Sequence, residues 1–142
     1  MEFIIPDFES KSVEKILLKL GFNNLNIFSF DSYYQFKKSD LFFSILKSGD
    51  FRDDSGFYFT FGDFSFFSTV DANNLNFGRF PKNITVFASS FASGARGYPL
   101  CYDNIDEFKK GEIIVRNKNA HKVKVINNII KLNSIYYIPY AG

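Results

Sequence analysis

The segment Phe57–Ser68 constrains the fold of this chain more than any other feature. It reads Phe-Tyr-Phe-Thr-Phe-Gly-Asp-Phe-Ser-Phe-Phe-Ser, so two aromatic runs flank a Gly-Asp pair. Aromatic residues favour strands, and Gly-Asp between two such runs is typical of a tight hairpin turn. The segment therefore predicts two antiparallel strands, at residues 57–62 and 64–69.

The same strand character extends along the first half of the chain. Aromatic and β-branched runs, separated by Asp, Ser, Gly or Asn, predict strands at residues 25–30, 33–37 and 41–47. Shorter apolar runs predict strands near both ends and at residues 84–89. Phe and Tyr together make up 20% of the residues, and such large side chains suit the core of a sheet-rich protein.

Two segments have helical periodicity instead. Residues 11–20 place apolar side chains at i, i+3, i+4 and i+7, with a serine available to cap the start and Gly21 at the end. A second helix is expected from the capping box Asn-Ile-Asp-Glu, with Asn104 as N-cap, to about residue 132. A break in this helix is expected near Gly111 or at the asparagines that follow.

The order strand, helix, meander, strand, helix, strand indicates an α/β fold, with one mixed β-sheet and helices packed on one face. The 142 residues have the size of a single domain, residues 1–142. Apolar strands outnumber the helices that could cover them. The other face of the sheet is therefore expected to be aromatic and exposed unless a partner covers it.

Charge and hydropathy exclude several classes of protein. The net charge is +2, from 17 basic and 15 acidic residues without an arginine cluster, which indicates no nucleic-acid partner. No apolar run approaches the roughly 20 residues of a membrane span, and the N-terminus lacks the basic region of a signal peptide. No membrane association and a cytoplasmic location are therefore expected. The single cysteine, Cys101, excludes an internal disulfide and a cysteine-based zinc site.

Few residues could carry chemistry. His121 is the one histidine and is expected at a solvent-facing helix position, while Cys101, beside aromatic residues, is expected to be a buried structural thiol. Asp71 follows directly on a strand, where a turn-forming or a ligand-binding carboxylate would both fit. In Ser93-Gly-Ala-Arg-Gly-Tyr-Pro, small residues let a backbone approach a ligand and Arg96 could hold a phosphate or carboxylate, although such glycines commonly serve a turn.

Five stretches together carry a resemblance to a known family. They read Thr69-Val-Asp-Ala-Asn-Asn, Ile84-Thr-Val-Phe-Ala, Ser89-Ser-Phe-Ala-Ser-Gly-Ala-Arg-Gly-Tyr-Pro-Leu-Cys-Tyr-Asp-Asn, Ile138-Pro-Tyr-Ala-Gly and, near the start, Ile5-Pro-Asp-Phe-Glu-Ser-Lys-Ser. They resemble the C-terminal part of the metallo-β-lactamase-fold domain of the CMP-N-acetylneuraminate hydroxylase-like group. More distantly, they are similar to the lactonase-like metallohydrolases. The resemblance spans essentially the whole chain.

The resemblance implies part of an αββα sandwich and, in the parent family, a divalent metal, zinc or iron. Asp71 matches a metal ligand of the family, but the HxHxDH motif that supplies most other ligands is absent here. No cofactor is therefore expected in this chain alone. The resemblance also implies a loop that binds an anionic small molecule such as a sugar nucleotide, formed by Asn73, Ser93, Gly94, Arg96, Gly97 and Tyr98.

The function expected on this basis is that of a fragment or partial domain of a metal-dependent hydrolase or hydroxylase, inactive on its own. Two alternatives stay open. The chain could be a non-catalytic ligand-binding or interaction module that kept the fold, or a subunit completed by another chain. The uncovered face of the sheet predicts either a homodimer or a missing N-terminal half packed against it.

Overall fold

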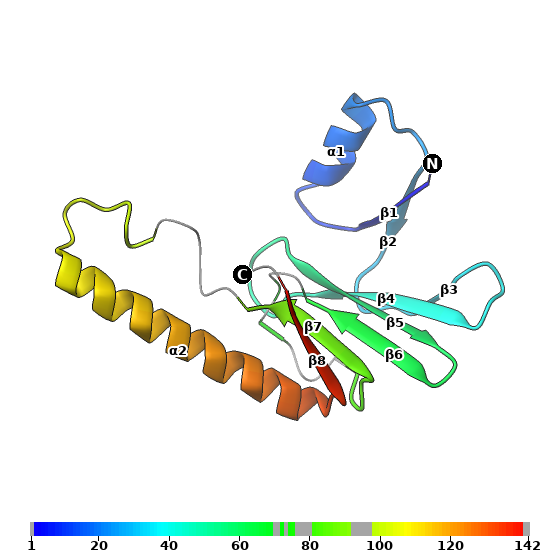
Figure 1. Cartoon of the computed structure of the whole chain (residues 1–142). Helices are drawn as coiled ribbons and strands as arrows, with labels where there is room; N and C mark the ends of the chain where they lie inside the picture. The colour runs from blue at the N-terminus through cyan, green and yellow to red at the C-terminus, as the bar shows by residue number, and fades with distance from the viewer. Residues whose placement is uncertain (1, 70–71, 73, 76–80, 92–97, 141–142) are drawn as a thin grey trace.

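The main body of the molecule is a six-stranded mixed sheet with the strand order β3-β4-β5-β6-β7-β8 (Figure 1). The computed structural model describes residues 2–69, 72, 74–75, 81–91 and 98–140. Strands β3 to β6 pair antiparallel, whereas β6, β7 and β8 run parallel to one another. The strands are β3 (Tyr34–Gln35), β4 (Leu41–Lys47), β5 (Ser55–Phe61), β6 (Phe64–Ser68), β7 (Val86–Ser90) and β8 (Tyr136–Tyr140). The predicted α/β class and mixed sheet are thus confirmed.

The hairpin that the aromatic segment predicts joins β5 to β6. Phe61 pairs with Phe64 across the turn, and Gly62 between them has a φ of 54°. Glycine adopts this left-handed conformation without the steric cost that a β-carbon would add. The Gly-Asp pair therefore fixes the register of the two longest aromatic runs.

One face of the sheet packs on the long helix α2 (Glu107–Leu132) and forms the core. The strand register places Leu46, Phe67 and Phe87 on this face, and each is at most 2% exposed. Leu132, near the end of α2, completes the cluster from the helix side. Full burial of one such side chain stabilises the fold by roughly 1.5–3 kcal/mol.

The opposite face of the sheet carries a broad apolar surface, which we call the open face. The register places on it the exposed side chains of Phe57, Phe61, Phe64, Tyr136 and Ile138. Between them, Phe59 stacks on Phe66 with ring centroids 5.3 Å apart. The structure therefore has the uncovered aromatic face that the excess of strands over helices predicts.

A small β-α-β unit covers one end of this second face. Strands β1 (Phe3–Pro6) and β2 (Leu25–Phe28) pair parallel and are joined by α1 (Ser12–Lys19), which makes a second sheet where the sequence predicted only one. Phe28 of this unit contacts Phe43 of β4 edge-on, with centroids 5.2 Å apart. Figure 1 shows the unit on the side of the sheet opposite α2. Contrary to expectation, α1 buries no residue.

Helix α2 begins two residues later than predicted and is not interrupted. Its N-cap is Asp106, not Asn104, and the Asp106 carboxylate accepts a hydrogen bond of 2.9 Å from the Lys109 backbone N–H. The helix continues through Gly111 and ends at Asn133, whose left-handed conformation is a common helix terminus. One glycine costs about 1 kcal/mol in a helix, too little to break one that packs along a sheet.

Candidate functional site

Two segments carry the site residues predicted from the sequence, one after β6 and one after β7. Both leave the sheet at the same edge. Strands β6, β7 and β8 are parallel, so their carboxyl ends lie side by side, and ligands in α/β sheets commonly bind outside such ends. Thr69 follows β6 and Phe91 follows β7. Asp71, Asn73, Ser93, Gly94, Arg96 and Gly97 lie outside the described residues.

The residues at which the two segments leave the sheet, Thr69 and Phe91, are hydrogen-bonded to neighbouring strands. The Thr69 backbone N–H donates to the carbonyl of Ala88 in β7 at 3.0 Å, and the Thr69 residue is fully buried. The Phe91 N–H donates to the carbonyl of Tyr140 in β8 at 3.1 Å. The hydroxyls of Ser68 and Tyr140 also share a hydrogen bond of 3.0 Å between the flanking strands. The described ends of the two segments are therefore held to neighbouring strands.

Asp50 is the centre of a polar cluster at this edge, on the connection between β4 and β5. Its carboxylate accepts a 3.0 Å bond from the Arg52 guanidinium, a 3.1 Å bond from the Arg52 backbone N–H and a bond from the Asn74 side-chain amide. Burial raises the pKa of Asp50, but the hydrogen bonds from Asn74 and Arg52 outweigh it and lower the pKa to about 2. Asp50 is therefore a fixed anion at neutral pH.

Asn74 connects this anion to helix α2. Its side-chain NH2 donates to Asp50, while its side-chain carbonyl accepts from the ammonium group of Lys124. Burial lowers the pKa of Lys124, and the nearby charge of Arg52 lowers it further, against the opposing charge of Asp50. The backbone carbonyl of Asn74 accepts from the Gly49 N–H at 2.6 Å. This one amide thus joins the β4–β5 loop, the segment after β6 and α2.

His121 and Cys101 differ from their expected environments. His121 is half-buried, and its Nε2 lies 3.0 Å from the carbonyl oxygen of Ser90 at the end of β7. Its ring also meets the ring of Phe91 at 6.5 Å. Cys101 is exposed, not buried. His121 therefore supports the strand end from the helix rather than facing solvent.

Tyr98 is the one predicted loop residue that the structure describes. Its side chain is exposed and packs edge-on against Tyr102, with ring centroids 5.6 Å apart. Sequence reasoning missed Asp50, Arg52 and Lys124, because polar residues between two predicted strands are typical of any loop. The alternation Asp50, Arg52, Asp54 was the available signal, since Arg52 pairs with both acids at 3.0 and 3.2 Å.

The described residues do not by themselves form a metal site. Within them, no group of three or more His, Cys, Asp or Glu side chains could hold an ion. His121 already bonds to a backbone oxygen, and Asp50 and Asp54 are ion-paired with Arg52. This part of the edge carries a fixed anion, Asp50, two cations, Arg52 and Lys124, and the half-buried His121, which supports a strand end. Among the described residues, no helix combines the length and the apolarity needed to cross a membrane.

Comparison with known proteins finds similarity in sequence to hydroxylases. No family model matches it. It is 30% identical over 130 residues to the cytidine monophosphate-N-acetylneuraminic acid hydroxylase of Mus musculus, 28% identical to that of Asterias rubens and 29% to that of Gorilla gorilla gorilla. The alignments cover 87%, 84% and 84% of this chain. They cover 22%, 19% and 20% of those relatives, so the chain spans about a fifth of their length.

A solved structure supports the same relationship at the level of the fold. A mutant of the CmlA β-hydroxylase, a metallo-β-lactamase-fold enzyme, superimposes with a TM-score of 0.63 at 14% identity. The match covers 98% of this chain and 31% of that one. The resemblance inferred from the sequence is thus confirmed: the chain resembles part of a metallo-β-lactamase-fold domain and is related in sequence to the CMP-N-acetylneuraminic acid hydroxylases.

Proposed function

We propose that this chain supplies one layer of a metallo-β-lactamase-type hydroxylase domain and that it is inactive without the remaining layer. The carboxyl-end edge of β6, β7 and β8 would form one wall of the active site. Metal-ligating histidines would come from residues beyond this chain, whether in the same polypeptide or in a partner. Asp71 would join them as a ligand, and the loop from Ser93 to Tyr98 would contact the substrate.

The observation that carries the proposal is the alignment with the hydroxylases over nearly the whole chain. The alignment spans both segments that leave the sheet at the β6–β8 edge. A solved hydroxylase structure also shares the fold of this chain. The single histidine of the chain, His121, bonds to the Ser90 carbonyl, which is why the other ligands must be supplied from elsewhere.

The open face supports the second half of the proposal. An apolar surface of this kind on one side of a sheet is characteristic of a face that packs on another sheet about 10 Å away. Phe61 and Tyr136 on this face are 59% and 63% exposed. Covering each such side chain would contribute roughly 1.5–3 kcal/mol, so a second layer would stabilise the domain substantially.

The proposed substrate class is based on the substrate in the names of the related hydroxylases. We propose an anionic small molecule of the sugar-nucleotide type, with cytidine monophosphate-N-acetylneuraminic acid as the first compound to test. Arg96 would bind a phosphate or carboxylate of that substrate, because a guanidinium forms paired hydrogen bonds to such groups.

The test compares the chain alone with the complete gene product. Each is purified, its metal content is measured by plasma mass spectrometry, and it is incubated with the sugar nucleotide, dioxygen and a reductant. We expect well under one metal per chain and no oxygenated product for the chain alone. Metal and product are expected for the complete protein. A stoichiometric metal in the isolated chain would overturn the proposed division of ligands.

A second candidate is a ligand-binding module without catalysis, favoured by the presence of only one histidine. In this case the complete gene product would also lack metal and turnover. It would still bind the sugar nucleotide in calorimetry, and Arg96→Ala would weaken binding while leaving the circular dichroism spectrum unchanged. Binding that is unaffected by Arg96→Ala would count against both candidates.

A further inference from the structure

Helix α2 has a second apolar stripe on the side that faces away from the sheet. Its buried side includes Ile113, Val125 and Leu132, which pack towards the protein. On the opposite side, the large apolar residues remain exposed, from Phe108 at 78% to Ile130 at 69%. We call the exposed line of seven positions the outer stripe: Phe108, Glu112, Val115, Asn119, Val123, Ile126 and Ile130.

The spacing of the outer stripe shows that it is one continuous surface. Successive members are 4, 3, 4, 4, 3 and 4 residues apart, which makes two periods of 11 residues. Such a period, about 3.67 residues per turn, keeps a stripe almost straight along a helix. The stripe is about 33 Å long, at 1.5 Å per residue. A helix that is apolar on both sides is normally covered on both sides.

The pattern is symmetric about its middle residue, Asn119. Four steps from the centre in either direction lie Val115 and Val123, and eleven steps away lie Phe108 and Ile130. If two copies of α2 met antiparallel, valine would face valine and Phe108 would face Ile130 of the other copy. Glu112, which pairs with Lys109 at 3.2 Å, would lie opposite Ile126 of the other copy. Asn119 would face itself, and an amide has both the donor and the acceptor that such a pairing needs. Self-complementarity of this kind is what a two-fold interface requires.

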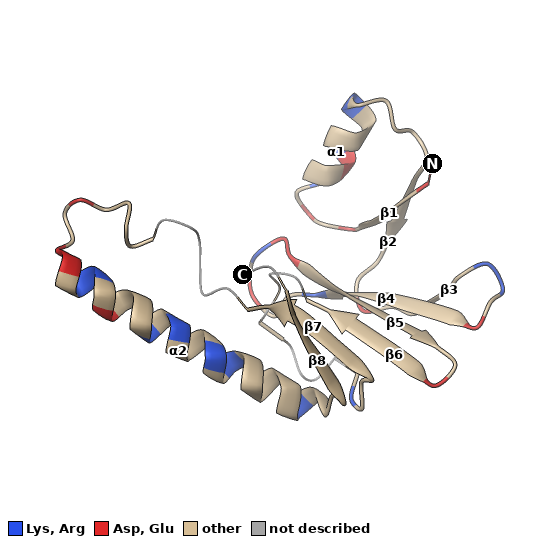
Figure 2. Ribbon diagram, viewed as in Figure 1, with Lys and Arg blue, Asp and Glu red and all other residues tan. Residues whose placement is uncertain are grey.

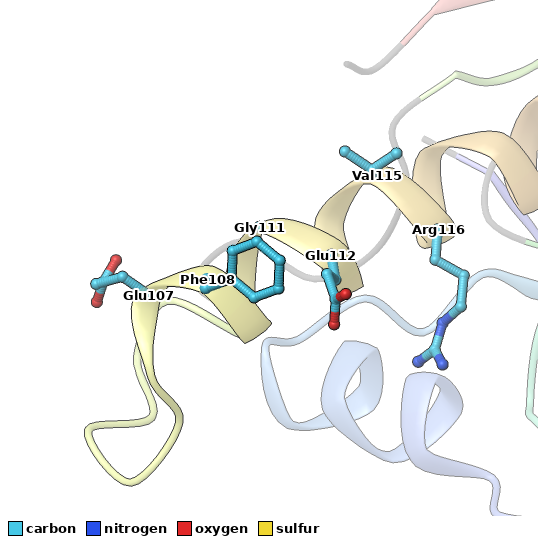
Figure 3. A pocket seen from close by; sticks show the side chains of 6 residues that line it. All are labelled: Glu107, Phe108, Gly111, Glu112, Val115 and Arg116. Carbon is cyan, nitrogen blue, oxygen red and sulfur yellow. The ribbon is translucent and has the colours of Figure 1, made fainter.

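A hollow on the stripe fits the same arrangement. Figure 3 shows the side chains that line it, among them Phe108, Gly111 and Val115, and its volume is about 520 Å³. A β-carbon at Gly111 would meet no atom within 4 Å, so the space above the glycine is open. In the antiparallel register this hollow faces Ile126 and Ile130 of the second copy, whose side chains could enter it.

We propose that the outer stripe of α2 is a docking surface for a second copy of this chain, with the two helices antiparallel and Asn119 on the two-fold axis. The inference is independent of the proposed function, because the stripe lies on the side of α2 that faces away from the sheet. A contact about 33 Å long and 10 Å wide buries roughly 700 Å² in total, below the size of stable complexes. The dimer is therefore expected to be weak.

Charged residues along the flanks of the stripe determine how dimer formation depends on salt concentration. Figure 2 shows several basic residues along α2. In the antiparallel register Lys118 lies beside Lys122 of the second copy, and these like charges repel. Salt screens that repulsion, so the dimer tightens as ionic strength rises. Lys118→Glu converts the repulsion into an attraction and is expected to tighten the dimer several-fold at low salt.

The decisive experiment is cysteine cross-linking across the proposed axis, in the complete protein with Cys101→Ser as background. Asn119→Cys is expected to give a disulfide-linked dimer under mild oxidation, because the two thiols meet at the axis. Asn127→Cys is the matched control. It is the same change on the same helix, but its two copies lie about 24 Å apart in this register. No cross-link at position 119, or equal cross-linking at both positions, would overturn the proposal.

Analytical ultracentrifugation gives an independent readout. Val123→Glu is expected to weaken association at least tenfold, because it places a charge one turn from the centre of the stripe, where valine would face valine. Phe61→Glu, on the open face of the sheet, is expected to leave the α2 contact unchanged. Association that is lost with Phe61→Glu but kept with Val123→Glu would move the interface to the sheet and refute the role of the helix.

Discussion

Gly56 in β5 lies where a methyl group has no room, and Gly56→Ala is expected to destabilise the fold. A β-carbon at this position would lie 2.6 Å from Cε2 of Phe67 and 3.0 Å from the carbonyl oxygen of Ser68. The ring cannot easily move away. It is fully buried and contacts Phe87, with ring centroids 5.8 Å apart, and Tyr58. The Ser68 carbonyl belongs to the neighbouring strand β6.

The expected loss is worked out from two opposing effects. Overpacking a core by a methyl group costs about 1–3 kcal/mol. Replacing glycine with alanine also restricts the unfolded chain, which returns about 0.4–1 kcal/mol. The free energy of unfolding should therefore fall by about 1–2 kcal/mol. The chain has no tryptophan, so urea unfolding is followed by circular dichroism, and an unchanged slope with a lower midpoint is expected.

Gly111→Ala is the matched control, because it makes the same change where space is open. It lies within α2 and a β-carbon there meets nothing within 4 Å, so it should raise the free energy of unfolding by about 0.5–1 kcal/mol. The two variants are compared at the same protein concentration. Gly56→Ala as stable as the parent protein would refute the reasoning. So would a double variant with Phe67→Leu that loses the full sum of both single changes.

Three further predictions concern charge, the bridging amide and the core. The pKa of Asp50 is lowered to about 2 in the folded protein, against 3.8 ordinarily. Its contribution to stability is therefore complete above about pH 4 and is lost as the pH falls towards 2, and Asp50→Asn should flatten this acid limb in a circular dichroism titration. Asn74→Ala should cost about 1–3 kcal/mol in urea unfolding, because it leaves partly buried charges of Asp50 and Lys124 without their shared partner. Leu132→Ala should cost about 2–5 kcal/mol, whereas Ile130→Ala two residues earlier should leave the monomer within about 0.5 kcal/mol of the parent protein.

Strand positions could be predicted well because their signals are local. Aromatic alternation around the Gly-Asp turn predicts β5 and β6, and most of their ends lie within one residue of the predicted ones. Gly21, with a φ of 87°, follows the end of the first helix as expected. The second, two-stranded sheet could not be foreseen, because the short run at residues 3–6 has no pattern that selects its partner. Its parallel pairing with β2 depends on contacts between distant segments.

The helix start and the buried cations were missed for a physical reason. Asn104 and Asp106 are both good N-caps, and the choice between them is made by packing that the sequence does not reveal. Lysine side chains are mostly exposed in proteins, yet Lys110 is 7% exposed and pairs with Glu107 at 2.8 Å. The polar cluster was hidden in the same way, since Asp50 and Lys124 are far apart in the sequence and meet only through Asn74.

The pairing of β8 with β7 has a consequence for how the chain folds. Val86 pairs with Tyr136, 50 residues further along, whereas Phe61 pairs with Phe64 across a two-residue turn. Closing a long loop costs more entropy before any contact is gained, so pairings of this kind form late. The meander β3–β6 should therefore assemble first, and α2 with β8 should dock afterwards. During synthesis on the ribosome, the aromatic strands β3–β6 would stay exposed until α2 and β8 have emerged. This chain is therefore a candidate for chaperone assistance during synthesis.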